Sequence, residues 1–280
     1  MNHTEYSEII ELWHQQRIKT LTQPDGFLTL VGLPWLKTGS NSIGSHSSND
    51  AIFPASLPEK IGVIQVSEGS IFLKVEDGVN AMVDNGRISH HPLLTDADPN
   101  GPTVVHMGTV NWFVIKRGDA LGIRIRDSQS KRRLNFQGVE RFAVDPKWQI
   151  EGTFAPWESP KTVPIPTILG TLEDMISPGV IHLTIQEQSV TLTALKSRYP
   201  NQFFLVIADE TTGKESYGGG RFLMSEPVAE NGRVFVDFNK AYNPPCAFSP
   251  YATCPRPPAE NRIPTSIMAG EKTFKDPFHE

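Results

Sequence analysis

The chain has 280 residues, with 26 Lys and Arg against 31 Asp and Glu, so its formal net charge is −5. This mild negative charge and the absence of a basic stripe argue against nucleic acid as a partner. No apolar run approaches the ~18 residues that span a bilayer, and the acidic N-terminal 25 residues have no signal-peptide core, so we expect a cytoplasmic protein. Glycine and proline make up about 16% of the chain, against roughly 12% on average, which predicts many turns.

The first segment carries the one helical pattern of the chain. Tyr6, Ile9, Ile10 and Trp13 fall at i, i+3, i+4 and i+7, which places them on one face of a helix. Acidic residues are concentrated in its N-terminal half, where they interact favourably with the helix dipole. The turn residues Pro24-Asp25-Gly26 predict its end.

After this helix the hydrophobic period changes to two, which is typical of strands. Short segments rich in β-branched residues are separated by turn residues, and Arg117-Gly118-Asp119 predicts a hairpin turn. The predicted strands are Ile61–Val66, Ser70–Val75, Val79–Val83, Val110–Ile115, Ala120–Arg126, Trp148–Phe154, Val180–Ile185, Val190–Leu195, Phe203–Ala208 and Arg233–Phe238. Many short strands without alternating helices predict an all-β, mainly antiparallel fold.

Composition divides the chain into three parts. We expect an N-terminal helix over 1–24, a β-sandwich over 25–130 and a β-barrel-like domain over 135–280. The boundary between the two β-domains lies within residues 127–147, where a charged segment is followed by a new strand pattern. Seven prolines lie between Pro244 and Pro264, which rules out a strand or helix interior there. Aromatic residues and cysteines in the same stretch prefer burial, so the loop 242–264 is predicted to be packed and to close the second domain.

Several short motifs do not complete a known site. Asp96–Gly101 begins like a calcium loop, but its twelfth position is Met107 in place of a bidentate Glu. His90 and His91 are adjacent and would point to opposite faces of a strand. Gly218–Gly220 lacks the Lys-Ser/Thr pair of a phosphate loop, and there is no Gly-x-Ser-x-Gly elbow. We therefore predict neither a metal site nor a cofactor.

Cys246 and Cys254 are too few for a disulfide scaffold or a closed zinc site. The interpretation we favour is two reduced, packed thiols of low reactivity. A catalytic thiolate would need a cation or base nearby. The candidate cations are Arg221, Lys240, Arg256 and Arg262.

The most specific blocks of the chain are Gly220–Leu223, Val236–Phe248, Tyr251–Pro255 and Pro257–Arg262. They resemble the bacterial and archaeal domain-of-unknown-function family 1684 (DUF1684). The resemblance extends to Trp13 with Arg17, Asp25–Leu28 with Gly32, and Arg124–Asp127. The family usually has Trp where this chain has Phe27 and Arg where it has Lys240. The resemblance implies a shared fold, but no activity or catalytic role.

A weaker resemblance lies in the N-terminal half. Gly39–Gly44, Asn49–Ile52 and Asn85-Gly86 resemble a forkhead-associated (FHA) β-sandwich. Such modules recognise phosphothreonine through an Arg and polar loop residues. Here Ile43-Gly44 stands at the Gly-Arg position and no Ser-x-x-His follows. We expect the sandwich without phosphopeptide binding.

Two functions are compatible with the most specific segments of the chain, which together we call the C-terminal block: Gly220–Leu223, Val236–Phe248, Tyr251–Pro255 and Pro257–Arg262. The first is a small-molecule site under the proline-rich loop, with catalysis left open; the second is a non-catalytic binding or interaction module in which the block is only structural. For the first, we expect Arg221 to pair with Asp237, directly or through one shared polar group. The candidate ligand-binding residues are Arg221, Asp237, Asn239, Tyr242, Asn243, Cys246, Tyr251, Asn261 and Arg262.

Overall fold

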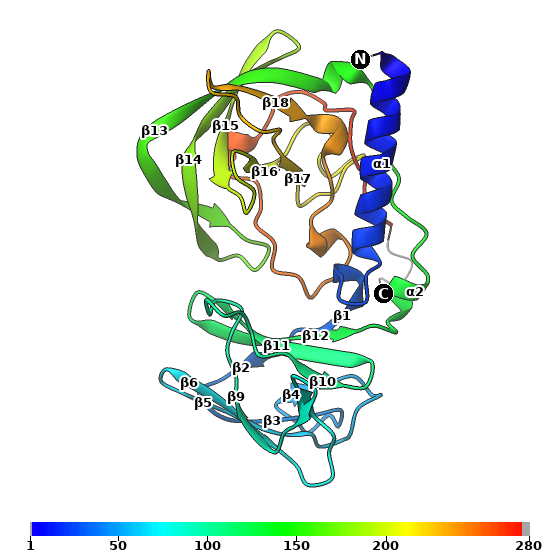
Figure 1. Ribbon diagram of the computed structural model, residues 1–280, viewed down its shortest axis with the longest axis vertical. Coiled ribbons are helices and arrows are strands. Elements are labelled where there is room, and N and C mark those ends of the chain that lie inside the picture. The colour runs from blue at the N-terminus through cyan, green and yellow to red at the C-terminus, as the bar shows by residue number, and fades with distance from the viewer. Residues whose placement is uncertain (1, 276–280) are drawn as a thin grey trace. The chain divides into compact units, whose positions relative to one another are not determined.

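The computed structural model describes residues 2–275, which divide into two compact units. One unit consists of residues 22–136. The other joins the N-terminal segment 2–21 to residues 137–275, and each unit has its own hydrophobic core (Figure 1). The all-β, mainly antiparallel prediction is confirmed. Within the described residues, none of the helices combines the length and apolar character needed to cross a membrane.

Residues 22–136 form a β-sandwich, as predicted, from two sheets with the strand orders β1-β12-β11-β10-β7-β8 and β4-β3-β5-β6-β9. In the first sheet, to which β2 also adds, the bounds are β1 Leu30–Gly32, β2 Trp35–Leu36, β7 Met82–Val83, β8 Gly86–Arg87, β10 Val105–Met107, β11 Val110–Arg117 and β12 Ala120–Asp127. In the second they are β3 Gly39–Gly44, β4 Ala51–Ile52, β5 Gly62–Ser67, β6 Ser70–Val75 and β9 His90–Pro92. Short helical turns are η1 Phe27–Thr29 and α2 Lys131–Leu134.

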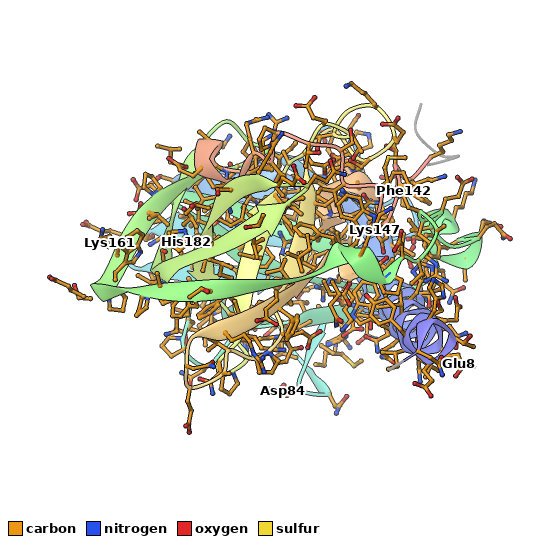
Figure 2. All side chains as sticks on the ribbon, turned by 90° about the horizontal axis from the view of Figure 1, so that it is seen from above. Glu8, Asp84, Phe142, Lys147, Lys161 and His182 are labelled. Atoms are coloured by element: carbon orange, nitrogen blue, oxygen red, sulfur yellow. The ribbon has the colours of Figure 1, made fainter. Side chains whose placement is uncertain are left out.

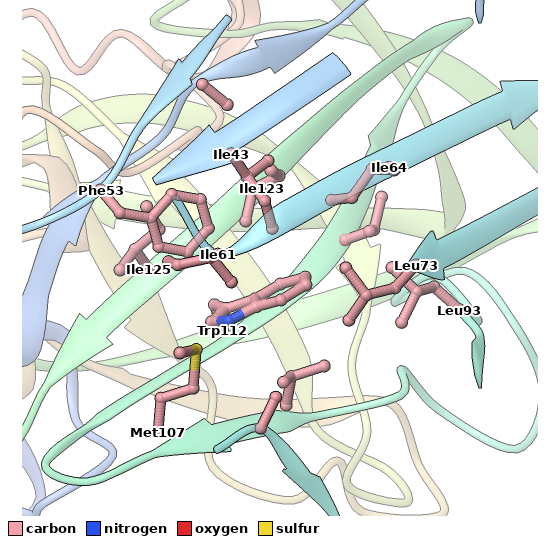
Figure 3. Packing of buried hydrophobic residues seen from close by; sticks show 14 of the residues in the cluster. Ile43, Phe53, Ile61, Ile64, Leu73, Leu93, Met107, Trp112, Ile123 and Ile125 are labelled. Atoms are coloured by element: carbon pink, nitrogen blue, oxygen red, sulfur yellow. The ribbon is translucent and has the colours of Figure 1, made fainter. Parts of the chain in front are cut away.

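The sandwich core lies between these sheets (Figure 3). Trp112 is fully buried at its centre and meets the ring of Phe53 edge-on, with 5.6 Å between the centroids. Ile64 and Leu73 contribute from the second sheet. The predicted strand over residues 79–83 is shorter in the structure, because the N–H of Val79 closes a turn onto the carbonyl of Glu76 at 3.2 Å.

The second unit is built on one six-stranded sheet, in the order β17-β16-β15-β14-β13-β18. Its strands are β13 Gln149–Pro166, β14 Leu172–Ile185, β15 Gln188–Lys196, β16 Phe203–Ile207, β17 Arg221–Met224 and β18 Arg233–Asp237. The sheet curls into a half-barrel, which Figure 2 shows from above with Lys161 and His182 on the curled strands. Its concave core includes the fully buried residues Ile181, Leu192, Leu205, Leu223 and Val236.

Strand β13 is longer than its sequence suggests. We predicted a strand over 148–154, but it continues to Pro166, and β14 correspondingly begins at Leu172. Prolines mask this continuation, since they cannot donate to a ladder. They are tolerated because β18 pairs only with residues 149–153, so the rest of β13 has a free edge, and its register with β14 shifts between Pro156 and Lys161.

The predicted N-terminal helix is present as α1, His3–Leu21, but fewer residues of its predicted apolar face are buried than we expected. Tyr6, Ile10 and Leu21 are buried, whereas Ile9 is 45% exposed. The helix packs beside the short turn η3, Phe238–Lys240, which follows β18 (Figure 1). This contact places the side chain of Tyr6 against the C-terminal block.

The proline-rich loop is packed, as predicted. It contains the short turns η4, Pro245–Ala247, and η5, Ala259–Asn261, and its Phe248 is fully buried. The loop is tied to the sheet by isolated bridges from Pro255 and Arg262 to residues 167 and 208. A further short turn, η2 Pro146–Trp148, precedes β13.

Candidate functional site

All nine candidate residues lie in the second unit, but the structure distributes them over separate hydrogen-bonded groups. Arg221 and Asp237 belong to different groups, and so do Asn243 and Asn261. Each group ties loop to sheet or helix to loop. What the polar atoms of each group bind decides whether they remain available to a ligand.

The predicted contact between Arg221 and Asp237 is wrong. The Nη2 of Arg221 donates instead to Oδ2 of Asp209 at 2.7 Å, and both side chains are buried, with exposures of 0% and 1%. The guanidinium also donates to the carbonyls of Ile267 and Ala269. The prediction failed in its register: Phe222, next to Arg221, forms an antiparallel bridge with Tyr242, so Arg221 lies opposite the segment that follows Asp237.

The Asp209 carboxylate forms further hydrogen bonds besides its ion pair with Arg221. Its Oδ1 accepts from the N–H and the hydroxyl of Thr211, at 2.9 and 2.7 Å, and from the N–H of Ile267 at 3.2 Å. Gly220 precedes the arginine with φ +85°, and a Cβ there would lie 2.3 Å from the ring of Pro257. Gly220 thus forms a tight bend against the proline-rich loop.

Asp237 belongs to a buried network with the N-terminal helix. Its Oδ1 accepts from the hydroxyl of Tyr6 at 2.7 Å and from the backbone N–H of Asn239 at 3.1 Å. The amide of Asn239 donates to that hydroxyl and to the carbonyl of Asp145, each at 3.0 Å. Burial raises the pKa of the Asp237 carboxyl, although the bonds from Tyr6 and Asn239 and the charge of Lys240 oppose the shift. Burial and this carboxyl together raise the pKa of Tyr6.

Asn243 joins the helix to the segment that contains Glu271 and Lys272. Its N–H donates to Oε2 of Glu271 at 2.7 Å, and its side-chain amide donates to the carbonyl of Lys272 at 2.7 Å. Arg17 donates to the Asn243 carbonyl at 2.8 Å and pairs with Oε1 of Glu271 at 3.2 Å. The guanidinium of Arg17 also stacks on the ring of Tyr242, 4.6 Å from its centroid.

The remaining candidates have different surroundings. The amide of Asn261 bridges β15 and β16 by donating to the carbonyls of Thr193 and Val206, at 3.1 and 3.0 Å. Its oxygen accepts from the N–H of Thr193, so its hydrogen-bonding capacity is used within the sheet. Arg262 is exposed and Tyr251 is half-buried. Asn261 shares no hydrogen-bond partner with Arg221 among residues 2–275.

The two cysteines are neighbours in space. The N–H of Cys246 donates to Sγ of Cys254 at 3.1 Å, and the Tyr217 hydroxyl donates to the Cys246 carbonyl, also at 3.1 Å. Cys254 is buried and Cys246 is half-buried. The sequence spacing alone did not predict this contact.

Not all polar atoms of the block are satisfied within the described residues. Arg221 Nε, Asp237 Oδ2 and Asn243 Oδ1 are buried and have no hydrogen-bond partner. Over residues 2–275, no group of three or more His, Cys, Asp or Glu side chains is placed to hold a metal ion. The polar residues of the block therefore mainly form hydrogen bonds within the protein, and a few of their buried polar atoms have no partner.

A groove opens elsewhere in the same unit, at the turn between β15 and β16. We call it the sheet-end groove, and it has a volume of about 520 Å³. Its lining comes from β13, β14 and the β15–β16 turn: Pro160, Ile176, Pro178, Lys196, Ser197, Arg198, Tyr199, Pro200, Asn201, Gln202 and Phe203. None of the nine candidate residues lines it.

In the sandwich unit, the polar side chains of residues 37–52, where the sequence resembles an FHA module, form hydrogen bonds with one another. Asp50 accepts from the N–H and hydroxyl of Ser42 at 2.9 and 2.8 Å and pairs with Lys37 at 2.6 Å. The bond from Lys37 and those from Ser42 lower the pKa of the Asp50 carboxyl. Gly44, at the position where an Arg would be needed, lies against the backbone of Glu59, which leaves no room for a Cβ.

The residues that sequence reasoning missed are mostly the partners of those it found. Asp209 directly follows the predicted strand Phe203–Ala208, so a carboxylate at the end of an apolar strand was a signal that could have found it, as it found Asp237 near the end of its strand. Tyr6 was identified only as a helix-face residue. Glu271 stands in a stretch without periodic pattern, so nothing local marked it.

Several solved structures are similar to parts of this chain. An uncharacterised protein of Haloarcula marismortui, solved by NMR, is 31% identical over 52% of this chain and 81% of its own, with a TM-score of 0.43. Parts of the chain are also similar to an FHA domain studied for phosphothreonine-dependent interactions (19% identity, 35% of this chain, 96% of that chain, TM-score 0.23). The FhaA FHA domain shows 18% identity over 34% of this chain and 97% of its own, with a TM-score of 0.23.

No curated protein matches the sequence significantly. Residues 134–272 match the model of a family described as protein of unknown function, DUF1684. This region contains the packed block and the half-barrel sheet. Through these residues, which are just under half of the chain, it is therefore similar to the DUF1684 family.

Proposed function

We propose that this protein is a non-catalytic binding module, in which the sheet-end groove takes up a small amphipathic anion and the C-terminal block is structural. The observation that carries the proposal is the groove itself. Its volume of about 520 Å³ falls in the range of roughly 300–1,000 Å³ that is usual for small-molecule sites.

The lining of the groove fits a ligand with a negative head and an apolar body. Lys196 and Arg198 are exposed and supply two positive charges, while the lining includes no Asp or Glu. Ile176 is 42% exposed and Tyr199 is 46% exposed, so apolar surface stands open beside these charges. No His or Cys lines the groove, which leaves it without a ready general base or thiol nucleophile.

The state of the predicted block supports the same assignment of roles. Arg221, Asn239 and Asn261 use their polar atoms largely to join β-strands, loop and helix. A ligand that bound these groups would have to replace internal hydrogen bonds, each of which costs about 1–3 kcal/mol when one buried partner is left without a replacement.

A fluorescent anion with an apolar body tests the proposal. We expect anilinonaphthalene sulfonate to bind the native protein more tightly than its neutral analogue, N-phenyl-1-naphthylamine. The variant K196S/R198S should weaken binding of the sulfonate by about tenfold, equivalent to roughly 1.4 kcal/mol, and should leave the neutral analogue unaffected. The matched control, K214S/R233S, removes two exposed charges that do not line the groove. Equal affinity of both probes, or equal effects of both double variants, would refute the anion site.

The predicted site under the proline-rich loop is the second candidate, and the unpaired buried atoms of Arg221, Asp237 and Asn243 favour it. Asp237 distinguishes the two sites, because its buried Oδ2 has no hydrogen-bond partner within the described residues and the residue does not line the groove. D237N keeps the size of the side chain. Loss of ligand affinity in D237N with an unchanged K196S/R198S would move the site to the block.

A further inference from the structure

The contact between the two cysteines carries an inference that is independent of the groove. Cys246 lies in the turn η4, directly after Pro244-Pro245, and Cys254 lies in the extended segment that is bridged to Thr167 through Pro255. The backbone N–H of Cys246 is 3.1 Å from Sγ of Cys254. Two thiols that are eight positions apart in the sequence are therefore held side by side by a rigid, proline-rich loop, with little conformational entropy to lose on joining them.

The two thiols differ in the two properties that decide reactivity, which are access and thiolate character. Cys246 is half-buried, whereas Cys254 is only 4% exposed. The thiol of Cys254 and the hydroxyl of Tyr217 lower the pKa of the Cys246 thiol by hydrogen bonding, and the charge of Arg256 contributes in the same direction. Burial opposes this shift without cancelling it. Cys246 is thus the more accessible thiol, and its surroundings favour its thiolate form.

We propose that Cys246 is a hydroperoxide-sensitive thiol and that Cys254 is its resolving partner, so that the pair forms a reversible intramolecular disulfide. The Cys246 thiolate attacks one peroxide oxygen, the S–O bond forms, the O–O bond breaks, and hydroxide leaves to be protonated to water. The sulfur is oxidised by two electrons to a sulfenic acid, and the peroxide is reduced.

The second step uses Cys254. Its thiol loses a proton and attacks the Cys246 sulfur, the S–S bond forms, the S–O bond breaks, and a second water leaves. In total, two thiols and one hydrogen peroxide give one disulfide and two waters. This proposal replaces our sequence-based expectation that both thiols react slowly, because that expectation took each cysteine by itself.

The test is oxidation of the native full-length protein with hydrogen peroxide, followed by mass spectrometry. We expect the intact mass to fall by two hydrogen atoms, and peptide mapping to join Cys246 to Cys254 within one chain. Dithiothreitol should restore both thiols. Retention of both thiols under conditions that oxidise the urea-unfolded chain would overturn the proposal, as would a disulfide that joins two chains.

Two single variants test the assigned roles. In C254S, dimedone should trap a sulfenic acid at Cys246, because the resolving thiol is gone. In C246S, the buried Cys254 should stay unlabelled under the same conditions. Equal labelling of the two variants would refute the asymmetry. Should either variant fail to fold, dimedone competition in the wild-type protein decides the order: early adducts on Cys246 support the proposal, and early adducts on Cys254 contradict it.

Discussion

Replacing Arg221 by Met tests which carboxylate the arginine compensates. Its ion pair with Asp209 is excluded from solvent, with exposures of 0% and 1%. Removing one partner of such a pair leaves an uncompensated buried charge and costs about 3–5 kcal/mol. For a unit of this size each kcal/mol lowers the melting temperature by roughly 2–4 °C, so R221M should lower it by roughly 6–20 °C. Calorimetry measures the melting temperature, and hydrogen exchange of β16 and β17 assigns the loss to this unit.

A matched arginine and two double-mutant cycles complete this experiment. Arg233 pairs with Glu151 at 3.9 Å at the surface, with side-chain exposures of 56% and 53%, so R233M should cost less than about 1 kcal/mol. R221M should couple strongly to D209N and not to D237N, because Arg221 and Asp237 share no hydrogen-bond partner among the described residues. A cost for R221M no larger than that for R233M, or stronger coupling to D237N, would refute the reasoning.

Two further predictions concern the network between the helix and the block. Tyr6→Phe removes the hydroxyl that donates to Asp237 at 2.7 Å, and it should lower the free energy of urea unfolding by about 1–3 kcal/mol, because a buried acceptor loses this donor. As a control, replacement of the exposed Tyr199 by Phe should change the free energy of unfolding by less than about 0.5 kcal/mol. Equal losses in the two variants would contradict the role of Tyr6. Burial raises the pKa of Asp237, so the folded protein retains this proton to a higher pH than the unfolded chain, whose carboxyl titrates near about 3.9. Its contribution to stability should therefore fall as pH rises from about 4 through the raised pKa, and D237N should abolish that part of the profile; an unchanged profile in D237N would disprove the assignment.

Local patterns were sufficient for much of the fold. The period of two over segments such as Ser70–Val75 places Ile71, Leu73 and Val75 in the core, and the structure agrees. The aromatic residues and prolines of the loop 242–264 indicated a packed closing segment, because such groups are buried at low entropic cost. Sequence reasoning failed where prolines interrupt a strand, as in β13 beyond Phe154. Proline is tolerated there because one edge of the strand is unpaired, and only the arrangement of the sheet shows which edges are unpaired.

The partners of the buried polar residues were decided only by the tertiary structure. Sequence analysis correctly singled out Arg221 and Asp237 as groups in need of partners, because a buried isolated charge is costly. It assigned them to each other on the assumption that antiparallel pairing places Arg221 opposite Asp237, whereas Phe222 pairs with Tyr242. The sheet order instead brings Asp209 to Arg221 and the N-terminal Tyr6 to Asp237, across 12 and 231 residues of sequence. Residue type and local period determine which side chains must be buried, whereas strand order and helix docking determine which of them meet.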